Sequence, residues 1–168
     1  LMIKSDPNLR PLMSWLLGGF SGSRWMDVFV LLPYVVPPMI VLIFYSRILN
    51  ILQLNDLHAQ TLGVNVNRTK TVVLLAASLV TASAVAFSGV IGFVGLVGPH
   101  IVRLIWGSDY RHLVPMSAIF GAGFLIVADL GARVIAIPTE LPVGIITAFF
   151  GAPFFIYILK TNKRSKGI

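Results

Sequence analysis

The sequence predicts an all-α protein that crosses a membrane several times. Hydrophobic residues make up 57% of the 168 residues and charged residues only 11%, whereas soluble domains average about 45–50% and about 25%. The hydrophobic residues are gathered into long runs with few charges between their ends. Such runs are typical of helices in lipid. We therefore expect one transmembrane helix bundle over residues 1–168, with about five crossings and a short cytoplasmic helix.

Composition argues against several other classes of protein. The chain has no cysteine, so it can form neither a disulfide framework nor a thiolate metal site. Its formal net charge is +7, but the basic residues lie between apolar runs, as in membrane topology, so we expect no nucleic-acid partner. The first residues do not have the pattern of a signal peptide.

Five apolar runs are the predicted spans. The first just reaches across a core of about 30 Å, and its three prolines should bend it and leave backbone carbonyls without helical partners. The second is rich in small residues, which favour packing against other helices. The third is short and is either a span or a re-entrant segment. The runs are residues 28–45, 71–91, 93–106, 113–137 and 143–159.

Lysine and arginine predict the orientation, because they are enriched on the cytoplasmic side of membrane proteins. The C-terminal tail is basic and should be inside. With five crossings, residues 46–70 are also inside and residues 1–27 form an extracytoplasmic segment. Nine of the thirteen basic residues then lie inside. If the short third run does not cross, the loop at 46–70 falls outside instead.

The loop at 46–70 is long for a helix connection and contains a predicted short helix. Asn55 or Asp56 can cap its start and Gly63 can end it. Leucines and Ala59 give it an apolar side. This helix either rests on the lipid headgroups or is offered to a cytoplasmic partner.

The order of several motifs resembles the FecCD-family permeases, the membrane subunits of type II ABC importers for ferric siderophores, haem and cobalamin. The most specific string runs from Ser88 to Arg103, with glycines at three-residue spacing before Pro99-His100. The other matching blocks are Trp15 to Gly19, Asp56 to Gly63, Asp109 to His112, Ala128 to Arg133, Glu140 to Gly144 and Gly151 to Phe155. The resemblance covers nearly the whole chain. It implies the C-terminal half of a ten-helix permease, so an N-terminal half is missing.

The resemblance implies a multi-pass protein of the prokaryotic cell (inner) membrane that forms part of the path for a metal chelate. Its implied partners are a cytoplasmic ATPase subunit, an extracytoplasmic substrate-binding protein and a second permease copy. The block from Asp56 to Gly63 resembles the coupling helix that contacts the ATPase, which makes residues 46–70 the cytoplasmic coupling loop. The coupling residues carried over to this chain are Asp56, Ala59, Leu62 and Gly63, and Arg133 is the residue implied to dock the binding protein.

The glycine string also has a structural interpretation that does not depend on the family resemblance. Gly89, Gly92, Gly95, Gly98 and Pro99 should allow close helix packing and a sharp reversal. They do not form a phosphate loop, because the Gly-Lys-Ser/Thr ending is absent.

Asp129 and Arg133 are four apart and share one helix face. An internal ion pair and a docking role for Arg133 are both open. His100 alone is not a metal site, since metals need three or four ligands.

Enzymatic chemistry is not expected, because no catalytic triad, cysteine nucleophile or zinc-protease helix is present. ATP would be hydrolysed on a separate subunit, and no cofactor is predicted. An autonomous small channel or secondary carrier is the alternative, although no internal repeat is found. A membrane assembly factor without a transport role is a third possibility. The sequence does not identify the chelate.

Overall fold

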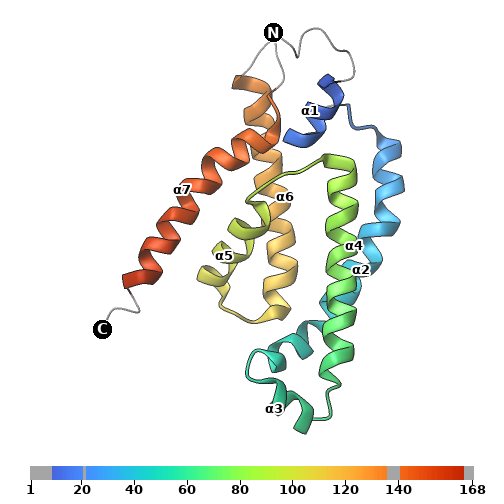
Figure 1. Cartoon of the computed structure of the whole chain (residues 1–168), viewed down its shortest axis with the longest axis vertical. Coiled ribbons are helices and arrows are strands. Elements are labelled where there is room, and N and C mark those ends of the chain that lie inside the picture. Colours follow the sequence, from blue (N-terminus) through green and yellow to red (C-terminus); the bar gives the residue numbers. More distant parts are fainter. Residues whose placement is uncertain (1–8, 21, 136–140, 165–168) are drawn as a thin grey trace. The chain divides into compact units, whose positions relative to one another are not determined.

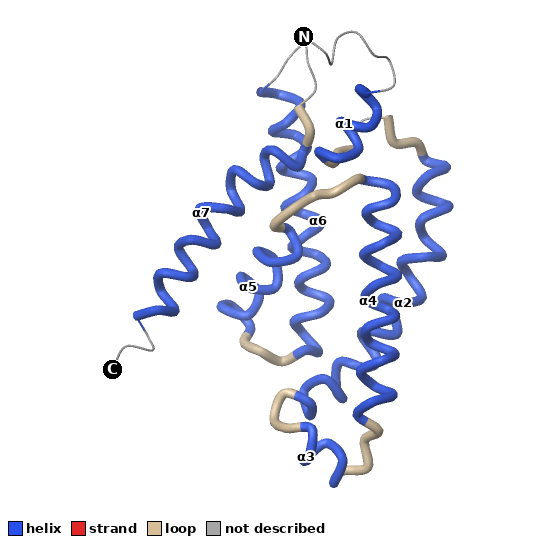
Figure 2. The backbone as a smooth tube through the Cα atoms, viewed as in Figure 1, coloured by secondary structure: helices blue, strands red, loops and turns tan. Residues whose placement is uncertain are grey.

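The computed structural model describes residues 9–20, 22–135 and 141–164, and every regular element in this part of the chain is a helix (Figures 1 and 2). The helices are α1 (Leu9–Leu17), α2 (Trp25–Leu52), α3 (Asp56–Thr61), α4 (Val66–Ser88), α5 (Val94–Trp106), α6 (Tyr110–Ile135) and α7 (Val143–Arg164). The predicted all-α class is confirmed. Residues 1–8 of the predicted extracytoplasmic segment, and Glu140, lie outside the described residues.

In the described part of the chain, three helices are long and apolar enough to cross a membrane: α2, α4 and α6, with 28, 23 and 26 residues. At about 1.5 Å per residue each exceeds a hydrocarbon core of about 30 Å. Two shorter apolar helices, Val94–Trp106 and Val143–Ile158, complete the set of five that the sequence predicts. The long helices extend past the apolar runs at one or both ends, because polar residues can continue a helix beyond the lipid.

Polar side chains within the apolar helices bond to the backbone of their own helix. In α2, the Ser46 hydroxyl donates to the carbonyl of Ile43 at 2.6 Å. In α4, the Thr81 hydroxyl donates to the carbonyl of Ala77 at 2.9 Å. Such bonds satisfy hydroxyl groups that lipid cannot. The helix α2 is also continuous through its three internal prolines.

The chain forms two compact units, each of which is described by itself. The first contains α1, the turn after α4 with the start of α5, the second part of α6, and α7. Its small core consists of Ala128, Ala132, Val143 and Ile146, with Phe20, Leu125 and Leu141 packed against them. Alanine at two core positions of α6 lets the start of α7 approach closely.

The second unit contains α2, α3, almost all of α4, the end of α5 and the start of α6. Large apolar side chains on its long helices are exposed, among them Phe29, Phe44 and Leu74. Exposed side chains of this kind are expected where a helix faces lipid or another protein rather than water.

Candidate functional site

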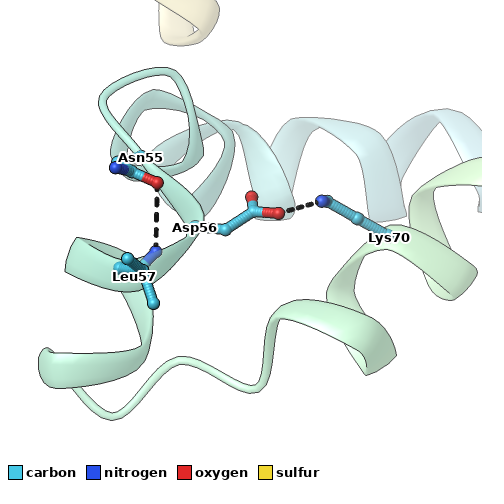
Figure 3. A network of polar contacts seen from close by, with 4 residues as sticks. All are labelled: Asn55, Asp56, Leu57 and Lys70. Atoms are coloured by element: carbon cyan, nitrogen blue, oxygen red, sulfur yellow. Dashed lines mark hydrogen bonds and ion pairs between the residues drawn. The ribbon is translucent and has the colours of Figure 1, made fainter.

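The predicted coupling segment begins at a capped helix end. The Asn55 side-chain oxygen accepts a hydrogen bond from the backbone N–H of Leu57 at 3.3 Å, and Asn55 has extended backbone angles. Of the two possible caps, Asn55 is therefore the one used (Figure 3). The bond satisfies one of the N–H groups that the first turn of α3 leaves without a partner.

The helix ends in a glycine turn. Gly63 has φ +80°, its N–H donates to the carbonyl of Gln60 at 2.9 Å, and the N–H of Val64 donates to the carbonyl of Ala59 at 3.0 Å. This pair of bonds is the Schellman motif, in which a left-handed glycine ends a helix and satisfies its last carbonyls. The predicted end at Gly63 is confirmed, and the backbone angle explains why the residue is glycine.

A salt bridge joins the start of α3 to α4. The Lys70 ammonium lies 2.5 Å from the Asp56 carboxylate, and both side chains are about half exposed (Figure 3). The Asn65 side chain caps α4 by accepting from the N–H of Arg68 at 3.0 Å. An exposed pair of this type contributes about 0–1 kcal/mol, so its main effect is to orient α3 beside the start of α4.

The two faces of α3 have different surroundings. Ala59 is fully buried within the chain, whereas Leu54, Leu57 and Leu62 are 77%, 68% and 68% exposed. The leucines form the outward face. The sequence predicted one apolar side shared by Ala59 and the leucines, but Ala59 faces inward, so its small size is required by the packing of the chain itself.

A shallow polar pocket of about 350 Å³ lies between the end of α3 and the start of α4. Its lining includes three amide side chains and two valines: Gln60, Gly63, Val64, Asn65, Val66 and Asn67. Together with the exposed leucines it makes a surface on which another protein could rest an apolar residue beside a polar one.

The chain does turn at the glycine string, but the turn covers only the first part of the string. Residues 89–93 lie between α4 and α5, and the residues in the left-handed region are Gly89 (φ +70°) and Phe93 (φ +67°). Gly92 lies in the turn, but Gly95, Gly98 and Pro99 lie within α5. The helix α5 therefore continues through Gly95, Gly98 and Pro99, and three-residue glycine spacing does not break it.

Three glycines from distant parts of the sequence meet in the first unit, and we call Gly18, Gly89 and Gly144 the glycine junction. The Gly19 N–H donates to the carbonyl of Ser88 at 2.8 Å, and the Gly144 N–H donates to the carbonyl of Gly18 at 3.4 Å. A Cβ atom on Gly18 would lie 2.6 Å from the Val90 carbonyl oxygen.

The other two members of the junction are equally tight. A Cβ on Gly89 would overlap the carbonyl oxygen of Trp15, and one on Gly144 would overlap that of Leu17. The motif blocks contained Gly18 and Gly144, but sequence reasoning assigned them no role. The signal that could have found them is the presence of glycine at the end of one helix and the start of another.

A ring of Phe93 packs against α7 where Gly151 leaves room for it, since a Cβ on Gly151 would overlap the Phe93 side chain. Beside it lies a small apolar cavity of about 80 Å³, lined in part by His100 and Phe154. These two rings meet edge to face with centroids 6.3 Å apart. His100 packs against Phe154 here, and no group of three His, Asp or Glu side chains among the described residues could hold a metal ion.

Asp129 and Arg133 form an ion pair on α6. The Arg133 Nε lies 2.8 Å from a carboxylate oxygen of Asp129, and the side chains are 54% and 23% exposed. The internal pairing is therefore present, and docking of a binding protein by Arg133 stays a prediction.

Comparison with known proteins gives one consistent result. Residues 1–161 match the model of the FecCD transport family. The cobalamin import system permease protein BtuC of Halobacterium salinarum is 53% identical over 97% of this chain and 44% of its own length. The hemin transport system permease protein HmuU of Yersinia pestis is 38% identical over 98% of this chain and 49% of its own length.

A third relative is the Fe(3+) dicitrate transport system permease protein FecD of Escherichia coli, 42% identical over 95% of this chain and 50% of its own length. A solved chain from a transporter described as of the metal-chelate ABC type, in an inward-facing conformation, superposes with a TM-score of 0.84 and 33% identity. That match covers 94% of this chain and 51% of the solved one. The chain therefore spans about half the length of these relatives.

Proposed function

Because the chain belongs to the FecCD transport family, we propose that it forms the C-terminal half of an ATP-driven import permease and carries the contact with the ATPase. The most direct support is that the short helix α3 is held in place by several contacts. A six-residue helix is far below the length at which helices are stable alone in water. Here it is fixed by a cap, a Schellman turn and a salt bridge, so it can present three exposed leucines as a rigid surface.

The exposed leucines favour a protein partner for α3. A surface helix of this kind can rest on lipid or in a groove of another protein. The shallow pocket beside α3 is lined mainly by polar groups, and a protein partner can offer it a polar side chain at a fixed distance from an apolar one. A cytoplasmic ATPase subunit with a cleft for α3 fits both features, and placing residues 46–70 inside agrees with the excess of Lys and Arg there.

The cargo we propose is a metal chelate. The relatives named above carry cobalamin, hemin and Fe(3+) dicitrate in their names, and each of these is a metal ion enclosed by an organic ligand. A path for such a cargo would require the N-terminal half and a second permease copy, since five apolar helices enclose little space. Arg133, exposed near the end of α6, would receive an extracytoplasmic binding protein.

The contact with the ATPase is tested by two arginine substitutions on opposite faces of α3. Leu57→Arg changes an exposed side chain and should leave thermal stability unchanged while abolishing co-purification of the ATPase subunit with the assembled permease. Ala59→Arg forces a charge into a buried position and should destabilise the protein itself. Normal ATPase retention by Leu57→Arg would contradict the proposal. Failure of the wild-type protein to bind an ATPase would favour an autonomous channel or carrier.

A further inference from the structure

The coupling loop is tied to a part of the chain that it does not directly join. The Asn50 side-chain amide, near the end of α2, donates to the Asp109 carboxylate at 2.6 Å. Its oxygen accepts the backbone N–H of Tyr110 at 2.8 Å. Gln53, three residues further on, donates to the carbonyl of Ser108 at 3.0 Å. These contacts lie within the second unit and link residues about 60 apart in sequence.

These contacts supply hydrogen-bond partners for the backbone at the start of α6. A helix leaves its first four N–H groups without helical partners. In α6 the N–H of Leu113 makes the first helical bond, to the Asp109 carbonyl. Of the three N–H groups of α6 before it, that of His112 also donates to the Asp109 carbonyl, that of Arg111 donates to the Asp109 side chain at 2.9 Å, and that of Tyr110 donates to Asn50. Asn50 therefore caps α6 from another helix.

The electrostatics of Asp109 agree with this arrangement. The Arg111 N–H, then the Asn50 amide, lower the pKa of the Asp109 carboxyl, and the nearby charges of Arg111 and His112 act in the same direction. The carboxylate therefore stays ionised and remains an acceptor for both donors at neutral pH.

We propose that Asn50 is a positioning residue that passes movement of the coupling loop into α6, by clamping the end of α2 to the Asp109 cap. Without the Asn50 contacts, the loop that carries α3 would keep its chain connections to α2 and α4 and the single hydrogen bond from Gln53 to Ser108. With the Asn50 contacts, displacement of the loop must carry the start of α6 as well, since α6 runs unbroken from Tyr110 to Ile135. This inference rests on the proposed function, because the ATPase supplies the displacement.

A reciprocal exchange tests the clamp itself. Asn50→Asp removes the donor and sets two carboxylates side by side, so thermal unfolding in detergent should occur several degrees lower. In the double variant with Asp109→Asn, the new carboxylate still accepts from Tyr110 and the new amide donates to it, so stability should return. Asn67→Asp adds the same charge at an exposed asparagine and serves as the control. A double variant no more stable than Asn50→Asp would overturn the clamp.

Transmission is tested with spin labels in the assembled transporter, formed with the N-terminal half and the ATPase and trapped with ATP and vanadate. One label is placed on α6 at Gly123→Cys, where an added Cβ meets no atom within 4 Å. The other is placed on α4 at Leu79→Cys, which is exposed. Wild-type trapping should change both spectra. Asn50→Asp should abolish the response of the α6 label and keep that of the α4 label. The double variant with Asp109→Asn should show both responses.

The outcomes separate this inference from the function on which it rests. An α6 response that persists in Asn50→Asp refutes the relay and leaves the proposed function standing. Loss of both responses in Asn50→Asp also refutes it, because the loop itself would then be disrupted. Absence of any response in the wild type refutes coupling to the ATPase, and the relay fails with it.

Discussion

Gly144→Ala adds one methyl group at the glycine junction, where the structure leaves no room. The new Cβ would overlap the Leu17 carbonyl oxygen and lie 3.2 Å from the Leu17 carbonyl carbon. These are backbone atoms, so no side-chain rotation can relieve the contact. Either α7 or the segment after α1 must move by about 1 Å to restore an ordinary carbon–oxygen separation of about 3.3 Å.

The loss of folding free energy comes from the overpacking and from the contacts that this movement disturbs. Overpacking alone costs about 1–3 kcal/mol. The shift also strains the hydrogen bond from Gly144 to Gly18, which contributes about 0.5–1.5 kcal/mol. Alanine returns up to about 1 kcal/mol through its higher helix propensity. The net loss is about 1–3 kcal/mol, or a fall in Tm of about 2–12 °C for a chain of this size.

The control is Gly123→Ala, another helical glycine whose added Cβ would meet nothing within 4 Å. This variant has the higher helix propensity of alanine without a steric clash, so its stability should be unchanged or slightly higher. Thermal unfolding of both variants in the same detergent, followed by circular dichroism, gives the comparison. A Gly144→Ala variant as stable as Gly123→Ala would refute the close approach of the backbones at the junction.

Three further outcomes are expected. The Asp109 carboxyl has a lowered pKa, so the stability lost in Asp109→Asn should be constant above its ordinary pKa of about 3.9 and should shrink as pH falls through the lower folded-state pKa, as unfolding titrations would show. Arg133→Ala should leave Asp129 unpaired and lower Tm, and Asp129→Asn in the same chain should recover it; unaltered stability of the single variant would favour docking alone. Gly63→Ala, at φ +80° with nothing within 4 Å, should cost about 1–2 kcal/mol from backbone strain, and a cost near zero in denaturant titration would contradict the Schellman geometry.

The helices were predictable because lipid leaves the backbone few choices. A segment without water must form its hydrogen bonds internally, so an apolar run of sufficient length becomes a helix. The runs at 28–45 and 113–137 were found this way, although both observed helices start earlier and α2 ends later. Both ends of α2 and the start of α6 lie outside the apolar runs, where capping contacts rather than hydrophobicity decide where a helix begins and stops.

The contacts of the site were less accessible to sequence reasoning. The caps of α3 depend on residues within a few positions, and Asn55 and Gly63 could be named in advance. The clamp between Asn50 and Asp109 joins residues 59 apart, and no local pattern marks that pairing. The inward face of Ala59 was also missed, because six residues are too few for helical periodicity to define a buried side.

The three residues of the glycine junction lie in three different blocks that resemble the FecCD family, and none of them has a polar side chain. Gly18 and Gly89 both have positive φ, and each follows the end of a helix. The carbonyls at those helix ends need donors, and in a low-dielectric setting an unsatisfied carbonyl costs several kcal/mol. The N–H groups of Gly19 and Gly144 supply two of those donors, and they can come close only because no Cβ stands between the backbones. The glycines therefore act through their backbone atoms, and substitution at any one of them should affect all three segments together.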